Sequence, residues 1–162
     1  MTVKSLTATR VLGELNKCGI THIVWLPDSR VRFMYEAMMS QDNVKLIPVC
    51  REGEAIAIAT GLRLGGKKPV VLYQNTGLFE SGDSLRGIGL DFKLPLLLLI
   101  GYDAGRTDSA AMFTRPILDA WNVKYYLVQS DNDVDSISVA YRQAHETNRP
   151  VAVLIGREKR QP

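Results

Sequence analysis

Short apolar runs alternate along the chain with amphipathic segments, and this alternation predicts the order of the elements. Six apolar runs have the length of β-strands and are bounded by turn residues such as Pro, Gly and Asp. The run at 94–100 is apolar without alternation, which is typical of a central parallel strand covered on both faces. The predicted strands are residues 22–26, 44–49, 69–73, 94–100, 123–128 and 150–155.

The segments between these runs have apolar residues at helical spacing or are rich in alanine, and they predict helices. Pro116 would fall in the first turn of its helix, where proline is tolerated. Asp131 or Asp133 can cap the last helix. The predicted helices are residues 7–18, 31–39, 52–64, 77–90 (interrupted by glycines), 114–121 and 131–146.

Strands and helices that alternate with short connections predict an α/β fold. We expect a single doubly wound domain over residues 1–162, with a mainly parallel six-stranded sheet and helices on both faces. Such sheets bind ligands at the carboxyl ends of their strands. The loops after the predicted strands are therefore the places to look for chemistry.

Composition narrows the class of protein. The chain has 162 residues, of which 46% are hydrophobic and 23% charged, as in a soluble globular domain. A net charge of +3 is a weak indication of nucleic acid, so no nucleic-acid partner is expected. Part of the basic excess lies at 157–160, where a solvated end is favoured over a phosphate-binding tail.

The apolar runs, cysteines and histidines indicate the cellular compartment and whether the chain binds a metal. The longest apolar run, 94–101, is too short to cross a bilayer, and the N-terminus lacks a signal-peptide core. Cys18 and Cys50 are the only cysteines and lie in no CxxC motif, so a reduced cytoplasmic protein is expected. With only two histidines, we expect no metal site on this chain.

Two of the predicted loops carry residues with alternative interpretations. Asp28, Ser29 and Arg30 follow the first strand and can cap the next helix or face a ligand. Glu52 and Glu54 follow the second strand, where acidic residues suit the start of a helix whatever their function. The residues alone favour the helix-start interpretation for both carboxylates.

Two further loops lie at the carboxyl ends of the predicted strands. Asn75-Thr76-Gly77 follows the third strand and can form a cap and tight turn, or bring backbone amides to an anion or polar ring. The polar loop at 101–108 contains Arg106 and can be a substrate loop or an ordinary surface loop. Neither a phosphate-binding GxxxxGK[ST] loop nor a nucleophile elbow is present.

Three consecutive motifs nevertheless resemble the pyrimidine-binding domain of thiamine diphosphate enzymes. In that family an acid opens an Ala/Gly-rich helix, a GKP turn follows, and the next strand ends in a TSG-like turn. The match in this chain consists of residues 51–61 (REGEAIAIATG), 66–72 (GKKPVVL) and 74–78 (QNTGL). The chain resembles in particular the alpha subunit of sulfopyruvate decarboxylase and the phosphonopyruvate decarboxylases.

This resemblance implies a role for several residues. Glu52 would be the catalytic acid that hydrogen-bonds the ring nitrogen of the cofactor's aminopyrimidine, and Asn75, Thr76, Gly77 and Leu78 would help to bind the cofactor. Thiamine diphosphate would then support decarboxylation of a small 2-oxo acid to an aldehyde.

The substrate side is also implied by the resemblance. Asp28, Ser29, Arg30 and Arg106 would face the substrate. An arginine there would suit the sulfonate of sulfopyruvate or the phosphonate of phosphonopyruvate.

The family's second domain, which holds the diphosphate and Mg²⁺, is marked by GDG and a later NN. Residues 82–84 read GDS, and NN occurs nowhere in the chain. The resemblance therefore implies a separate diphosphate-binding beta subunit, in an α2β2 or larger assembly with the cofactor at the interface.

Two other functions remain open from the sequence. The chain can belong to a thiamine-dependent carboligase of the acetolactate or acyloin type. It can also be a non-catalytic α/β module that binds a nucleotide or acts as a regulator.

Overall fold

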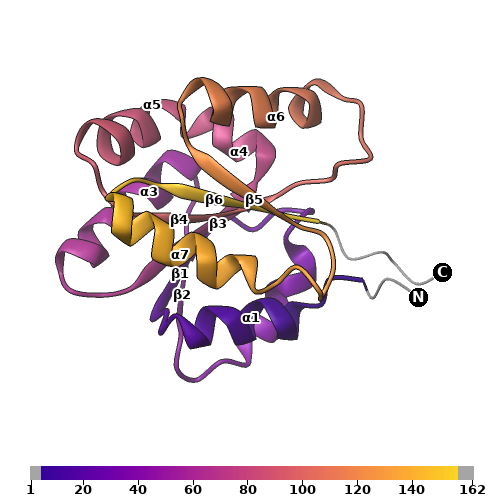
Figure 1. Cartoon of the computed structure of the whole chain (residues 1–162). Coiled ribbons are helices and arrows are strands. Elements are labelled where there is room, and N and C mark those ends of the chain that lie inside the picture. Colours follow the sequence, from indigo (N-terminus) through magenta and orange to yellow (C-terminus); the bar gives the residue numbers. More distant parts are fainter. Residues whose placement is uncertain (1–4, 157–162) are drawn as a thin grey trace.

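Six strands form one fully parallel sheet in the computed structural model, which describes residues 5–156 (Figure 1). The strand order is β2-β1-β3-β4-β6-β5. The strands are β1 (His22–Trp25), β2 (Lys45–Pro48), β3 (Pro69–Gln74), β4 (Leu97–Gly101), β5 (Lys124–Val128) and β6 (Val151–Ile155). Each lies where an apolar run predicted it, and the predicted α/β fold class is confirmed.

Helices cover both faces of the sheet (Figure 1). One face carries α1 (Ala8–Lys17), the 3₁₀ turn η1 (Arg32–Met34), α2 (Tyr35–Met39) and α7 (Ser136–Thr147). The other carries α3 (Glu52–Leu64), α4 (Asn75–Glu80), α5 (Gly82–Ser84), the π-helical turn η2 (Leu85–Asp91) and α6 (Ser109–Ala120).

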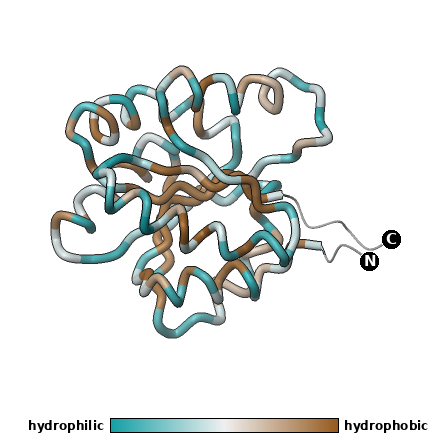
Figure 2. The backbone as a smooth tube through the Cα atoms, viewed as in Figure 1, coloured by the Kyte–Doolittle hydropathy of each residue, from teal (hydrophilic) through white to brown (hydrophobic). Residues whose placement is uncertain are grey.

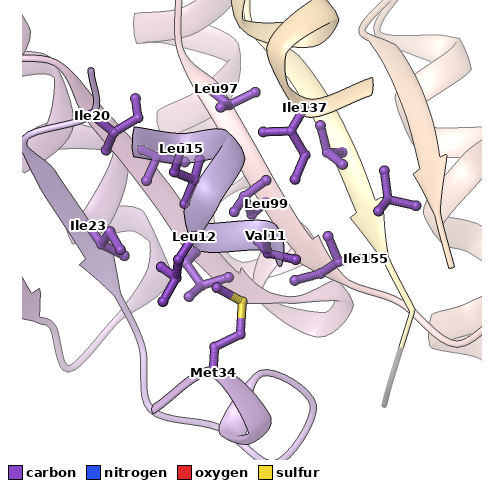
Figure 3. Packing of buried hydrophobic residues seen from close by; sticks show 14 of the residues in the cluster. Val11, Leu12, Leu15, Ile20, Ile23, Met34, Leu97, Leu99, Ile137 and Ile155 are labelled. Atoms are coloured by element: carbon purple, nitrogen blue, oxygen red, sulfur yellow. The ribbon is translucent and has the colours of Figure 1, made fainter. Parts of the chain in front are cut away.

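Two apolar layers, one on each face, form the core. Successive side chains of a strand point to opposite faces, so Val70 and Leu72 of β3 pack into one layer and Val71 and Tyr73 into the other. Figure 2 shows the hydrophobic residues concentrated along the central strands. In Figure 3, side chains of α1 such as Leu15 lie over the sheet beside those of β4. Because β4 and β6 are buried along their whole length, the sheet offers ligands its edge rather than its faces.

Helices α6 and α7 do not start where the sequence predicted. Helix α6 begins at Ser109 because the Asp108 side chain accepts a hydrogen bond from the Ala111 amide at 3.0 Å, so Pro116 lies inside the helix and not in its first turn. Helix α7 begins only at Ser136. The two expected caps are used elsewhere: Asp131 accepts from Thr7, and Asp133 accepts from the amides of the preceding turn.

The predicted helix at 77–90 is three short pieces, α4, α5 and η2. Its first piece starts two residues earlier than expected, so in the QNTGL segment Gln74 ends β3 and the other four residues form the first turn of α4. The basic segment 157–160 lies outside the described residues. None of the described helices combines the length and apolar character needed to cross a bilayer.

Candidate functional site

Glu52 is the first residue of α3, four positions after β2 ends at Pro48. Glu54, two residues later, is the carboxylate that closes the helix start. Its Oε2 accepts hydrogen bonds from the backbone amides of Cys50 and Arg51, each at 3.2 Å. Among residues 5–156, no side-chain hydrogen bond reaches the Glu52 carboxylate. Glu54 therefore stabilises the start of the helix, and Glu52 is the carboxylate that is available for chemistry.

Gly77 of α4 lies against the Glu52 side chain. A Cβ atom at Gly77 would lie 2.5 Å from Cγ and 2.8 Å from Oε1 of Glu52. Contacts that short do not occur, so any side chain at position 77 would displace Glu52. The predicted catalytic acid and the predicted QNTGL segment thus meet at one point, although 25 residues separate them in the sequence.

Asn75 opens α4 and is fully buried. Neither its Oδ1 nor its Nδ2 has a hydrogen-bond partner among the described residues. A buried amide without partners is costly, so this position calls for a bound water or ligand group. Thr76 beside it is exposed, whereas Leu78 is part of the apolar layer beneath α3.

Tyr73, near the end of β3, lies in the same apolar layer as Leu78 of α4. Its hydroxyl is buried and accepts a hydrogen bond from the Ser81 hydroxyl at 3.2 Å. Burial raises the pKa of Tyr73 above its usual range, and the charges of Glu52 and Glu80 act in the same direction. The tyrosine is therefore a neutral structural partner and not an acid for catalysis.

Asp28 lies at the carboxyl end of β1. Its Oδ1 accepts hydrogen bonds from the amides of Arg30 at 2.7 Å and Val31 at 3.1 Å, as the capping interpretation predicted. Its Oδ2 is buried without a partner in the described part of the chain. Burial raises the pKa of Asp28, although these amides favour the charged form.

Asp28 and Ser29 line a hollow of about 820 Å³. An aromatic pair, Trp25 and Tyr35, stacks at 5.6 Å between ring centroids in its wall, and Arg32 lies at its rim. Trp25 belongs to the apolar layer on the face opposite α3. The hollow is therefore on the other side of the sheet from Glu52.

Arg30 and Arg106 lie toward the end of β4. The Arg30 Cβ would be 3.0 Å from a Cβ atom at Gly101, the last residue of that strand. Arg106 forms an ion pair with Asp108. The Ala111 amide and Arg106 lower the pKa of Asp108, and the charge of Arg30 adds to this. Both predicted arginines thus lie near Asp108, and neither is among the residues that line the hollow with Ser29.

Helix α3 leaves a strip of its surface uncovered by the rest of the described chain. Ala57, Gly61 and Leu64 recur at helical spacing on it, with Ile58 beside them, and Leu64 is 74% exposed. We call these four residues the outer strip of α3. A Cβ atom at Gly61 would meet nothing within 4 Å.

Metal ligands do not gather in the described part of the chain: residues 5–156 contain no group of three or more His, Cys, Asp or Glu side chains suited to a metal ion.

Sequence reasoning missed Glu80, which contacts the residues on both sides of Glu52. The available signal was its spacing: Glu80 follows Gly77 by three residues and so shares its helix face.

A family model described as thiamine pyrophosphate enzyme, N-terminal TPP binding domain, matches residues 7–123. The alpha subunit of sulfopyruvate decarboxylase from Methanococcus maripaludis is 26% identical, over 85% of this chain and 86% of its own length. The same subunit from Methanocaldococcus jannaschii is 29% identical, over 89% of each chain. Phosphonopyruvate decarboxylase from Streptomyces hygroscopicus is 27% identical over 58% of this chain and 23% of its own.

Among solved structures, benzoylformate decarboxylase from Polynucleobacter necessarius has the same fold. Its superposition gives a TM-score of 0.76 at 20% identity. The match covers 98% of this chain but only 32% of that one.

Proposed function

Because this chain belongs to the thiamine pyrophosphate enzymes, as an N-terminal TPP binding domain, we propose that it is the alpha subunit of a 2-oxo acid decarboxylase. The substrate is sulfopyruvate or phosphonopyruvate, and the product is the corresponding aldehyde. The observation that carries the proposal is the contact between Glu52 and Gly77, which holds an unbonded carboxylate at the sheet edge. The names of the relatives support the choice of substrates.

The residues at this edge fit the pyrimidine half of thiamine diphosphate. Glu52 offers a free carboxylate, Asn75 an unpaired amide, and Thr76 an exposed hydroxyl. Gly77 permits the close approach, and Leu78 anchors the turn in the apolar layer. The bound cofactor supplies the nucleophilic carbon and the electron sink for decarboxylation.

Glu52 performs the proton chemistry that this chain contributes. A carboxyl group at the opening of α3 can hold a proton at Oε1 or Oε2 and share it with a ring nitrogen. Gly77 lies against one side of this side chain and leaves the space that its carboxyl group occupies. Glu54 cannot replace it, because its Oε2 is occupied by two backbone amides.

Substrate recognition falls to the loops after β1 and β4. Arg30 and Arg106 share the neighbourhood of Asp108, and two guanidinium groups suit a sulfonate or phosphonate. We propose Asp28 and Ser29 as further substrate contacts from the resemblance alone, since they follow β1, which lies between β2 and β3 in the sheet.

The active site is completed by a partner. We propose that a beta subunit binds the diphosphate and Mg²⁺, and that an α2β2 or larger assembly places the cofactor between the chains. Two observations support this: two of the relatives are named as alpha subunits, and the outer strip of α3 presents apolar surface on the helix that begins with Glu52. The proposed single domain over 1–162 is thus half of an active site.

The decisive experiment measures decarboxylation of sulfopyruvate and phosphonopyruvate by this chain with its partner subunit. Glu52→Gln keeps the size of the side chain but cannot exchange the proton, so we expect kcat to fall by about 100-fold or more. Aldehyde release is followed by a coupled dehydrogenase assay, and thiamine diphosphate binding by calorimetry.

Glu54→Gln is the matched control. It removes a charge two residues away and weakens the helix start by about 1 kcal/mol, with kcat retained. Full activity of Glu52→Gln would contradict the proposal. Tight binding of a nucleotide by the lone chain, without thiamine diphosphate binding beside a partner, would favour a non-catalytic module. Carboligation products would favour a thiamine-dependent carboligase.

A further inference from the structure

We propose that Glu80 is a positioning residue that fixes the turn bearing Glu52 by holding the residues on either side of it. The proposal rests on the proposed function, because it concerns how the catalytic acid is placed. Nothing in the sequence motifs assigned a role to Glu80.

Both oxygens of the Glu80 carboxylate are engaged with the start of α3. Oε2 accepts a hydrogen bond from the Gly53 amide at 2.7 Å. Oε1 accepts from Nε and pairs with Nη2 of Arg51, each at 3.1 Å. Arg51 and Gly53 flank Glu52 directly, so one carboxylate binds the side chain of the residue before the catalytic acid and the backbone amide of the residue after it.

The Gly53 amide is one of the donors that the start of a helix leaves without an intrahelical partner. Such donors are ordinarily satisfied from within the same segment, as the amides of Cys50 and Arg51 are by Glu54. Here the acceptor comes from another helix, 27 residues further along the chain. The bond therefore fixes α3 relative to α4 rather than merely completing α3.

Helix α4 meets the same turn at two points. Gly77 lies against the Glu52 side chain, and Glu80, one turn later on the same helix face, binds its neighbours. A movement of α4 that broke one contact would break the other. Helix α4 therefore contacts both the side chain of Glu52, through Gly77, and the backbone next to it, through Glu80.

Stability alone does not account for this arrangement. The Arg51 side chain is 73% exposed and that of Glu80 33% exposed, and ion pairs in such positions add little to the stability of a fold. The same contacts can matter more for catalysis, because a small displacement of a catalytic group strongly reduces the rate of the reaction.

The test uses the purified complex of this chain with its partner subunit. Thiamine diphosphate affinity is measured by calorimetry with Mg²⁺ present, and kcat and KM are measured for the 2-oxo acid. For Glu80→Ala we expect the cofactor dissociation constant to rise and kcat to fall, each about tenfold, with the KM of the 2-oxo acid unchanged. Hydrogen exchange of the segment 51–55 should become faster.

Glu80→Gln tests the geometry further. Its amide oxygen can still accept from Gly53, but it loses the charge for Arg51, so cofactor affinity should lie between those of the wild type and Glu80→Ala. Asp83→Ala is the control: Asp83 pairs with Arg86 in the next segment, and its removal should leave every readout unchanged.

The outcomes separate the two proposals. A wild-type complex that binds no thiamine diphosphate overturns the proposed function and the positioning role with it. A wild-type complex that binds the cofactor, with Glu80→Ala equal to it in affinity, kcat and exchange at 51–55, overturns the role of Glu80 alone.

Discussion

Glu52 and Gly77 form a pair in which each residue restricts the other. The side chain of Glu52 occupies the volume that a Cβ atom at position 77 would need. The glycine lies in helix α4, where it costs stability relative to alanine, so its presence is explained by this contact and not by the helix.

Gly77→Ala tests the pair. We expect the free energy of unfolding to fall by about 1–3 kcal/mol, because an added methyl group in a closely packed position forces its neighbours to move. Binding of thiamine diphosphate should weaken as well, since the displaced group is Glu52. Urea denaturation and calorimetry measure the two effects.

The double variant Gly77→Ala/Glu52→Ala provides the control. Truncating Glu52 removes Cγ, Cδ and Oε1, the three atoms that the new methyl group would meet. The double variant should therefore be more stable than Gly77→Ala alone, although it should remain inactive. Simple addition of the two single effects would argue against a direct contact.

The burial of Asp28 predicts how the stability of the folded chain depends on pH. Burial raises the pKa of Asp28 above the ordinary value of 3.8. Below that value the carboxyl group is protonated in both the folded and the unfolded chain and costs nothing. As the pH rises above that value the unfolded chain ionises first, so the folded chain loses stability until the pH has passed its own raised pKa.

Asp28→Asn keeps an oxygen to accept from the Arg30 and Val31 amides but cannot ionise. Its stability relative to the wild type should therefore improve as the pH rises above the ordinary pKa of 3.8, and then stay constant once Asp28 of the folded wild type is ionised. Thermal melts of both proteins from about pH 3 to about pH 7 measure the difference. Parallel melting curves at all pH values would show that the Asp28 carboxyl group titrates normally.

At the scale of elements, the predictions succeed where the signals are local. Helix α3 has the bounds expected from the sequence, because acidic residues mark its first turn and Gly65-Gly66 its end. The strands were found because apolar runs bounded by turns are also local features. Helix α6 was placed too late because Asp108 is an effective cap within a loop that reads as continuous polar sequence.

The arrangement around Glu52 was only partly predictable, because it depends on contacts between residues far apart in the sequence. Motif spacing identified Glu52 and the QNTGL segment, but the contact between Glu52 and Gly77 depends on how α3 and α4 pack. The roles of Glu54 and Glu80 depend on hydrogen bonds whose partners no periodicity indicates. Sequence therefore located the site, while packing determined which carboxylate is free.

At the scale of the whole molecule, the proposed active site is open on one side. Glu52 stands at the beginning of α3, and the outer strip of the same helix is uncovered by the described chain. Small residues at 57 and 61 allow another backbone to approach closely, while Leu64 and Ile58 offer apolar area. A partner seated on the strip would pack against the same helix that begins with Glu52.

Gly61→Arg should prevent assembly with the partner subunit while leaving this chain folded. A Cβ atom at Gly61 meets nothing within 4 Å, so the arginine has room in the lone chain, and it favours a helix more than glycine does. In the assembly, a long charged side chain would stand in a close apolar contact. Light scattering of the mixed subunits measures assembly, and circular dichroism of the lone chain measures folding.

Gly13→Arg is the matched control, since Gly13 also lies in a helix, has equal room for a side chain, and belongs to α1 on the opposite face of the sheet. This variant should assemble normally and retain decarboxylase activity. If Gly61→Arg assembled as well as Gly13→Arg, the partner would have to approach Glu52 from the side of α4, and the outer strip of α3 would not be the interface.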